Sequence, residues 1–299
     1  MRLKADLTLL LVAIIWGSAF VAQRVAGQMG SVYLFNAARY LLAALAVLPL
    51  ALRVGRSTNL THIPREQYKW MLIAGSLLFA GSALQQVGVV YTTAGNAGFF
   101  TGLYVVLVPI ALFIVWREKP HWISIVAVVL AGVGAFLLST GGKLEFKAGD
   151  VLVLISALFW TFHVIVLGKY ASKFEAMTFS VGQLFICGIL NFGLGVFVEP
   201  FPPFDWSLVA AVVYTALFSL ALAYTLQIWA QRHTPPADAA LILSLESVFA
   251  VLAGWLFLNE TLAAIQILGC ALIFIAVVLS QFKEWNSGAL DHNHLVEGR

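Results

Sequence analysis

Charged residues are scarce in this sequence. They make up 10% of its 299 residues, whereas 61% of the residues are hydrophobic. An ordinary soluble domain has about 25% charged and 45–50% apolar residues, so no water-exposed fold accommodates this composition. The apolar residues come in stretches of about 20, each long enough to cross roughly 30 Å of hydrocarbon as a helix. We therefore expect the lipid bilayer to be the partner of this chain, and no nucleic-acid partner is indicated.

Cysteine is scarcer still, and its scarcity excludes two classes of protein. The only cysteines, Cys187 and Cys270, both lie in apolar segments, so neither a disulfide framework nor a CxxC metal site is available. The chain also lacks a nucleophile–base or metal-ligand constellation with persuasive spacing. We expect no metal, no cofactor and no enzymatic activity.

The apolar segments indicate an all-α polytopic membrane protein. They lack the alternating pattern of a barrel strand, and a helix satisfies its own backbone hydrogen bonds in lipid. We predict ten transmembrane helices, at 6–26, 31–52, 69–90, 95–116, 121–139, 150–170, 176–198, 206–230, 237–258 and 261–282.

The distribution of lysine and arginine predicts the orientation. With the N-terminus placed in the cytoplasm, thirteen of these residues fall in cytoplasmic segments. Only three, Arg24, Lys143 and Lys147, fall in outer loops. The excess of basic residues in short loops marks the cytoplasmic side, so we expect both termini in the cytoplasm.

The two halves of the chain show weak but ordered similarity. Trp16 aligns with Trp160, and Glu118 aligns with Glu260 in matching junctions. Five spans in each copy is an odd number, so the second copy has to be inverted relative to the first, as in many transporters. We predict two inverted five-helix repeats, residues 1–142 and 143–284, followed by a polar, disordered tail at 285–299.

Three polar residues within the predicted spans are candidates for the substrate pathway, because a polar side chain is costly in lipid. Glu246 lies about 14 Å from the cytoplasmic end of its span and Arg39 about 12 Å from the outer end of its own. Their depths nearly coincide, which favours a charged transport centre; a structural Arg–Glu pair and separate partners are the alternatives. His163 fits either proton coupling or a hydrogen bond to a neighbouring helix.

Four further residues complete the candidate set. Trp16 and Trp160 are aligned by the repeat and are expected to form facing walls of one cavity, although both also fit packing roles. Gln86 is a pathway candidate in span 3, with a hydrogen bond between helices as the alternative. Pro109 is the best candidate for a hinge inside a span.

Five stretches carry a family resemblance: WGSAFV at 16–21, FNAARYLLAAL at 35–45, YTTAGNAGFFTGLYVVLVP at 91–109, WREKP at 116–120 and TPPADAALILSLESVFAVLAGWLFLNET at 234–261. Together they resemble the ten-helix, EamA-like branch of the drug/metabolite transporter superfamily, and within it the YddG-type amino-acid exporters. The resemblance implies an inverted repeat, cytoplasmic termini in the bacterial plasma membrane and export of small metabolites by alternating access.

The resemblance also carries individual residues. It matches Arg39 to the arginine of the second span, Glu246 to the acid of the ninth span, and Glu118 and Glu260 to paired junction glutamates with a structural role. Ser247 departs from the family pattern, since many relatives have proline after the acid. The bend of span 9 is therefore left open.

The leading hypothesis is a secondary transporter that exports small metabolites, above all amino acids. The alternative is a multidrug efflux carrier, because an aromatic cavity with one acid fits an amphipathic cation. A channel or receptor is the second alternative. The sequence leaves the oligomeric state open.

Overall fold

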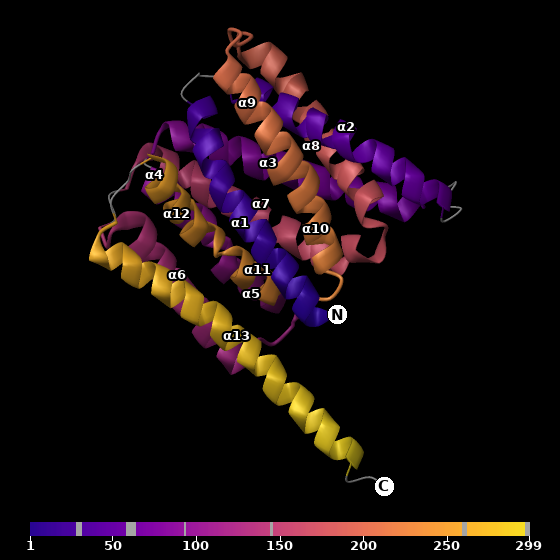
Figure 1. Ribbon diagram of the computed structural model, residues 1–299, viewed down its shortest axis with the longest axis vertical. Helices are drawn as coiled ribbons and strands as arrows, with labels where there is room; N and C mark the ends of the chain where they lie inside the picture. The colour runs from indigo at the N-terminus through magenta and orange to yellow at the C-terminus, as the bar shows by residue number, and fades with distance from the viewer. Residues whose placement is uncertain (28–31, 58–63, 93, 144–145, 259–261, 297–299) are drawn as a thin grey trace.

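In the computed structural model, helices joined by short turns and loops make up the residues that it describes, which are 1–27, 32–57, 64–92, 94–143, 146–258 and 262–296. Figure 1 shows a bundle of packed helices from which one long helix continues at the C-terminal end. The 3₁₀ turn η1 and the π-helix η2 interrupt the α-helices. In chain order the elements are α1 (Arg2–Gly27), α2 (Tyr33–Ser57), α3 (Arg65–Val90), α4 (Ala94–Gly102), α5 (Tyr104–Trp116), α6 (Trp122–Thr140), α7 (Ala148–Lys169), η1 (Ala171–Lys173), α8 (Ala176–Val198), α9 (Trp206–Tyr214), η2 (Thr215–Leu222), α10 (Ala223–Ala230), α11 (Pro236–Leu243), α12 (Glu246–Leu258) and α13 (Ala264–Val296).

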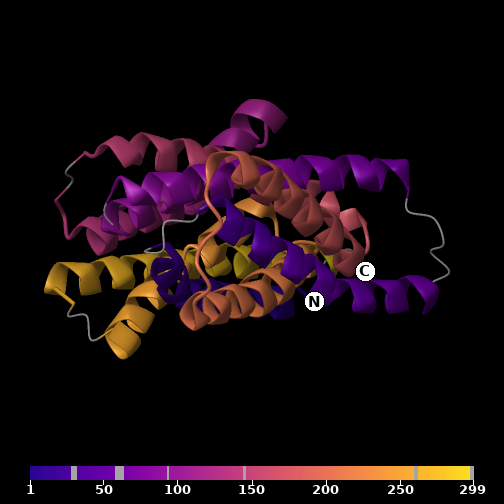
Figure 2. The same ribbon diagram turned by 90° about the horizontal axis from the view of Figure 1, so that it is seen from above.

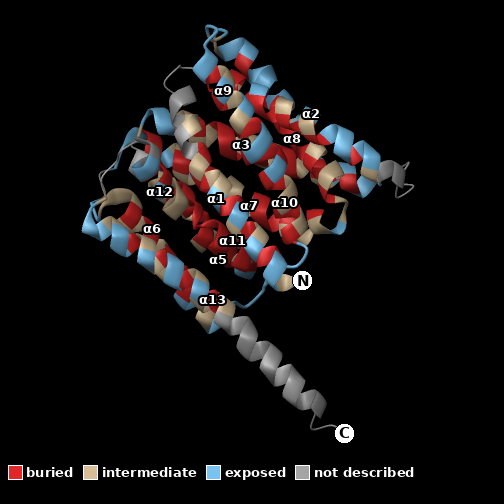
Figure 3. Ribbon diagram, viewed as in Figure 1, coloured by how far each residue is buried: buried red, intermediate tan, exposed pale blue. Residues whose placement is uncertain are grey.

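The prediction of an all-α polytopic membrane protein is confirmed. Within the described part of the chain, nine helical segments are long and apolar enough to cross a membrane, with mean hydropathies between 1.5 and 2.4. Figure 3 shows buried residues facing the interior of the bundle and exposed residues on its outer faces. α1 covers the first predicted span but is not among the nine. The count of ten spans and the inversion of the repeats stay predictions.

The two halves of the chain are interleaved. α1 packs against α9, α10, α11 and α12, all of which belong to the second half, and α7 packs against α3, α4 and α5 of the first half. The outer pairs are α2 with α8 and α6 with α13. Figures 1 and 2 show α13 lying along α6 at one edge of the bundle. Each half therefore supplies its first helix to the helices of the other.

Glycines allow two of these helix pairs to approach closely. A Cβ atom on Gly134 of α6 would lie 2.8 Å from the carbonyl oxygen of Gly269 on α13. A Cβ atom on Gly149 of α7 would lie 2.2 Å from the carbonyl oxygen of Gly88 on α3. Small residues at such crossings let backbones pack against each other in place of a hydrophobic driving force.

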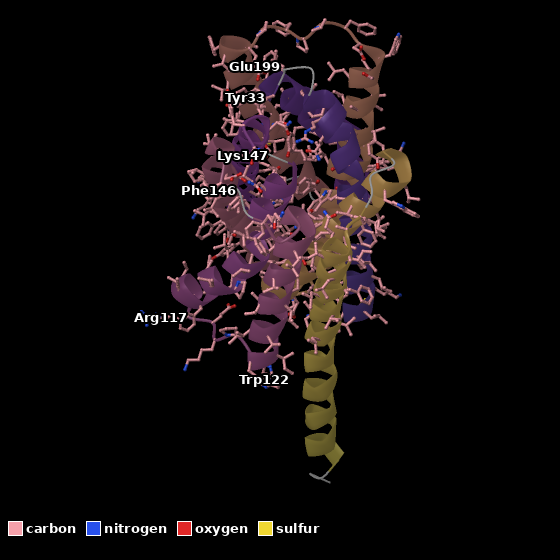
Figure 4. The ribbon with its side chains drawn as sticks, turned by 90° about the vertical axis from the view of Figure 1, so that its left-hand side faces the viewer. Tyr33, Arg117, Trp122, Phe146, Lys147 and Glu199 are labelled. Atoms are coloured by element: carbon pink, nitrogen blue, oxygen red, sulfur yellow. The ribbon has the colours of Figure 1, made fainter. Side chains whose placement is uncertain are left out.

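Side-chain carboxylates start several helices. Glu199 accepts hydrogen bonds from the backbone N–H groups of Val32, Tyr33 and Leu34, which are free donors at the N-terminus of α2. Figure 4 places Glu199 beside Tyr33 at one end of the bundle and Trp122, at the start of α6, toward the other. A buried α2 terminus is thereby tied to the end of α8.

The junction between α5 and α6 supports the structural role expected for Glu118. Arg117 has a φ of 57°, which ends α5 in the left-handed conformation. Glu118 then forms an ion pair with Lys169 at the end of α7. Its predicted counterpart, Glu260, lies outside the described residues.

The C-terminal helix enters the predicted tail. α13 runs to Val296 and so covers most of residues 285–299, while side chains beyond Gln281 lie outside the description. The disorder of the tail and the domain boundaries at 1–142 and 143–284 stay predictions.

Candidate functional site

A cavity of about 80 Å³ lies inside the bundle. One water needs roughly 10–15 Å³ of such space, so the cavity has room for several water-sized groups. Helices from both halves of the chain contribute to its wall. The lining residues are Trp16, Gln23, Arg39, Tyr40, Gln85, Thr101, Tyr104, Trp160, His163, Val164, Ser219, Leu220, Tyr224, Gln227, Leu243 and Glu246.

Two of the membrane-spanning segments are interrupted beside this cavity. α4 ends at Gly102 and α5 begins at Tyr104, while α11 ends at Leu243 and α12 begins at Glu246. Tyr104 and Glu246 are thus the first residues of the second half-helices, and both line the cavity. Backbone hydrogen bonds continue across both junctions, from the N–H of Leu103 to the carbonyl oxygen of Phe99 and from the N–H of Ser244 to that of Ala240. Each junction is therefore a local irregularity within one helical span, of the kind that secondary transporters place beside their substrates. The bend of span 9 stays open.

Arg39 and Glu246 line the same cavity without forming an ion pair. Both side chains are buried, with 5% and 9% of their surfaces exposed. Arg39 donates from Nε to Oδ1 of Asn36 at 3.0 Å, and its guanidinium carbon lies 5.1 Å from the ring centroid of Phe35. Within the described part of the chain, no carboxylate oxygen lies within 4.0 Å of Arg39. The structure therefore brings the two candidates to one site but does not pair them.

Aromatic rings form one wall of the cavity. The indole N–H of Trp16 donates to the carbonyl oxygen of Ser219 at 2.8 Å, and its ring centroid lies 5.1 Å from that of Tyr224. His163 meets the Tyr224 ring edge to face at 5.7 Å and the Trp160 ring at 6.1 Å. Trp16 and Trp160 therefore lie around one shared ring cluster rather than apart.

His163 makes the hydrogen bond to a neighbouring helix that was one of its two interpretations. Its Nε2 lies 3.0 Å from Oε1 of Gln183 on α8. The ring is also part of the cavity wall, and only 1% of its surface is exposed. Both placements hold at once, so its part in proton coupling stays a prediction.

Two sequence candidates lie away from the cavity wall. Gln86 is buried but does not line the cavity, whereas its neighbour Gln85 does and donates to Thr101 at 2.9 Å. Consecutive residues project about 100° apart on a helix, so a shift of one residue separates a cavity face from a packing face. Pro109 lies within α5, while the interruption of span 4 lies at Leu103. A hinge at Pro109 stays a prediction.

Several polar groups of the cavity wall have no hydrogen-bond partner among the described residues. They are the Trp160 indole N–H, the Tyr104 hydroxyl and both ends of the Gln227 amide. The Tyr104 hydroxyl lies close to the Glu246 carboxylate, but the two groups form no hydrogen bond of ordinary geometry. Leaving such a buried group unsatisfied costs about 1–3 kcal/mol, so these groups favour a polar occupant.

Sequence reasoning missed Tyr104 as a cavity residue. A signal for Tyr104 was present, because the register that aligns Glu118 with Glu260 also places Tyr104 on Glu246. Gln227 is marked by its own chemistry, since an amide within an apolar span is costly in lipid. Span 8 contains the π-helix η2, which contributes Ser219 and Leu220 to the cavity wall, and such distortions are frequent at functional sites.

The chain is similar to several known transporters. An uncharacterized transporter of Archaeoglobus fulgidus is 36% identical over 282 residues, which cover 94% of this chain and 87% of that protein. The threonine/homoserine exporter RhtA of Salmonella typhimurium is 29% identical over 169 residues, covering 55% of this chain and 56% of the exporter. A chloroplastic WAT1-related protein of Arabidopsis thaliana is 23% identical, covering 91% of this chain and 68% of that protein.

The fold comparison and the family comparison agree on architecture. A crystal structure with 16% sequence identity superposes with a TM-score of 0.77 over 94% of this chain and 98% of its own, which shows a shared fold. The EamA-like transporter family matches two consecutive segments, residues 3–140 and 147–282. These matches cover nearly all of the membrane-spanning part of the chain, so the protein is a membrane transporter and belongs to the EamA-like transporter family.

Proposed function

We propose that this transporter is a secondary carrier that exports amino acids by alternating access around the central cavity. The observation that carries the proposal is the pair of opposite charges, Arg39 and Glu246, that line one cavity without pairing with each other. The RhtA relatives, named as threonine/homoserine exporters, support the same substrate class.

The energetics of buried charge favour a zwitterionic substrate. A charge inside the membrane is costly and is ordinarily paired with an opposite charge. An amino acid supplies a carboxylate for Arg39 and an ammonium group for Glu246, so one ligand satisfies both. The planar guanidinium of Arg39 also matches the geometry of a carboxylate, which a lysine would not.

The remaining wall residues take supporting roles in this proposal. Trp16 and Trp160 form apolar walls around the bound molecule, and His163 orients the Tyr224 ring that joins them. The unpartnered groups of Tyr104 and Gln227 lie where a polar substrate would meet them. We assign the chain no enzymatic step, in keeping with relatives that are named transporters.

Multidrug efflux is the second candidate, and the aromatic wall is the observation that favours it. Trp16, Trp160 and Tyr224 present ring faces and edges to the cavity, and such rings attract organic cations. Arg39 argues against a cationic cargo, because it places a fixed positive charge in the same small space. A channel or receptor has no specific observation in its favour.

We place the protein in the plasma membrane with both termini in the cytoplasm. The basis is the bias of lysine and arginine toward one set of loops. The bacterial cytoplasmic membrane is the location that the family resemblance implies.

The direct test is transport by purified protein in liposomes. Vesicles are loaded with a panel of unlabelled amino acids, and exchange with external labelled amino acid is measured with and without a pH gradient. Protein-dependent exchange of at least one zwitterionic amino acid is expected. Exchange of cationic dyes in the absence of amino-acid exchange would replace the proposal with the multidrug alternative.

A further inference from the structure

A buried polar cluster ties the start of α1 to the start of α11. We call it the Asp6 cluster, and it consists of Arg2, Asp6, Thr234 and Asp238. Arg2 donates from Nε to both carboxylate oxygens of Asp6 at 3.0 Å and from Nη2 to Oδ2 of Asp238 at 2.9 Å. Thr234 donates its hydroxyl to Oδ1 of Asp6 at 2.8 Å. Asp6 is 8% exposed and Asp238 is 1% exposed, so the two carboxylates are shielded from water, whereas the Arg2 side chain between them is 24% exposed.

A second buried cluster ties the start of α7 to the start of α4. We call it the Asp150 cluster, and it consists of Thr92, Asn96, Lys147 and Asp150. Asp150 is fully buried. Its carboxylate accepts hydrogen bonds from the Thr92 hydroxyl, from Nδ2 of Asn96 at 2.9 Å and from the backbone N–H of Lys147 at 2.7 Å.

The two clusters occupy equivalent positions in the two halves of the sequence. The register that aligns Trp16 with Trp160 also places Asp6 on Asp150. For the partner residues of these two carboxylates, the register that aligns Glu118 with Glu260 places Thr92 on Thr234 and Asn96 on Asp238. Each cluster is therefore a carboxylate on the first helix of one half, bonded by a threonine hydroxyl from the other half.

The clusters flank the central cavity along the helix axes. Asp6 and Asp150 each precede a cavity-lining tryptophan by ten residues, or about 15 Å of helix. In each case the partner segment leads into a half-helix, α11 or α4, that is interrupted at the cavity. If the two halves are inverted, α1 and α7 run in opposite directions and the clusters lie toward opposite faces of the membrane.

We propose that the two clusters are the closing contacts of the transport pathway, one at each end. The Asp6 cluster breaks when the cavity opens to the face that carries the N-terminus, and the Asp150 cluster breaks when it opens to the other face. This proposal rests on the alternating-access carrier proposed above. Both contacts are formed in this structure.

Local helix capping does not account for these contacts. Asp150 caps its own helix through the N–H of Lys147, and that bond alone would satisfy a capping role. Thr92 and Asn96 belong to the other half and add nothing to the cap of α7. The same holds for Thr234, which bonds to Asp6 across the interface of the two halves.

The clusters also differ in chemistry. The Asp6 cluster joins two carboxylates through one arginine, whereas in the Asp150 cluster neutral side-chain donors surround a single carboxylate. All these hydrogen bonds end on a carboxylate, but the bonds from Arg2 join two ionised groups and therefore add Coulomb attraction, which the neutral donors to Asp150 do not supply. Loss of the Asp6 carboxylate is therefore expected to favour opening of its own end more than loss of the Asp150 carboxylate favours the opposite end.

The test measures access to the cavity from each face. Ser219, in the cavity wall, is replaced by cysteine as a reporter, and its reaction with an impermeant thiol reagent is followed in sealed vesicles of both orientations. The protein without Ser219→Cys provides the background from Cys187 and Cys270. Asp6→Asn is expected to raise the labelling rate from the N-terminal face by about tenfold, the effect of losing one or two charge-assisted hydrogen bonds. Asp150→Asn is expected to raise labelling from the opposite face.

A milder pair of variants keeps the test decisive when the asparagine variants fold poorly. Thr234→Val and Thr92→Val each remove one hydroxyl from equivalent positions and are expected to shift labelling severalfold in opposite directions. Thr161→Val is the matched control, because within the described part of the chain the buried Thr161 hydroxyl bonds only to the carbonyl oxygen of Ala157 in its own helix. Equal shifts toward one face, or no shift in folded variants, would overturn the proposal. Labelling needs no substrate, so a carrier of another compound class would still give the opposite shifts, whereas loss of amino-acid exchange alone would reject only the substrate assignment.

Discussion

The two halves of this transporter carry different groups at aligned positions of their sequences. In the register that aligns Glu118 with Glu260, Tyr104 of the first half corresponds to Glu246 of the second, and each begins a half-helix beside the cavity. The first half supplies a neutral phenol there, and the second supplies a carboxylate. The positive charge of the cavity, Arg39, comes from the first half. Aligned positions of the sequence thus carry unlike chemistry, and residues from both halves line one cavity.

The largest expected effect comes from a topology test, which decides how the two halves are oriented in the membrane. A cysteine introduced beside Arg56 is expected to be shielded from an impermeant outside thiol reagent in intact cells, whereas one beside Lys143 is expected to react. The reason is the bias of basic residues toward cytoplasmic loops. Permeabilised cells are the control, in which both positions should react. Reversed labelling would overturn the orientation.

Removing either fixed charge is expected to have the next largest effect. Glu246→Gln and Arg39→Gln should each reach the membrane at near-normal levels and lose about thirtyfold or more of the amino-acid flux. Truncating one partner of a buried charge interaction costs about 2–5 kcal/mol, and each substitution removes one of the two groups that bind the zwitterion. Flux into liposomes and the amount of folded protein are measured together. Wild-type flux in both variants would eliminate the charged centre, and degradation of both would favour a structural role.

The close crossing of α3 and α7 can be tested by comparing the stability of two glycine-to-alanine variants, one at the crossing and one away from it. In Gly149→Ala the new Cβ would lie 2.2 Å from the carbonyl oxygen of Gly88, so the helices must separate. Overpacking costs about 1–3 kcal/mol, and we expect the melting temperature in detergent to fall by about 5 °C. Gly193→Ala is the matched control, because beyond its own stretch of helix no atom of the described residues lies within 4 Å of the added Cβ. An unchanged melting temperature for Gly149→Ala would show that this crossing is looser than described.

The smallest expected effect sharpens the contrast between Tyr104 and Glu246. Tyr104→Phe removes one hydroxyl and no charge, so we expect about a fivefold loss of amino-acid flux, in line with roughly 1 kcal/mol for a hydrogen bond to the substrate. The protein should remain as stable as the wild type, because this hydroxyl has no hydrogen-bond partner in the part of the chain that the structure describes. A loss as large as that of Glu246→Gln would mean that the two halves contribute equally to binding.

Much of the fold follows from local composition. Long apolar segments made membrane helices the expected element, and nine of them are found among the described residues. Polar and aromatic residues within an apolar span can be recognised one by one from the sequence. Five candidates found in this way line the cavity: Arg39, Glu246, Trp16, Trp160 and His163. Composition could not show which of Gln85 and Gln86 faces the cavity, because that depends on how α3 is rotated about its axis.

The sequence by itself determined the class of the protein, since a chain with so few charges and such long apolar stretches is stable only in a bilayer. It also determined which side chains are too polar to face lipid. The tertiary structure decided which of them meet. Arg39 and Glu246 share a cavity without pairing, and Pro109 lies within an unbroken α5 while the interruption occurs at Leu103. The distances between such groups depend on how helices from the two halves interleave, which is set by packing between residues far apart in the chain and not by any local pattern.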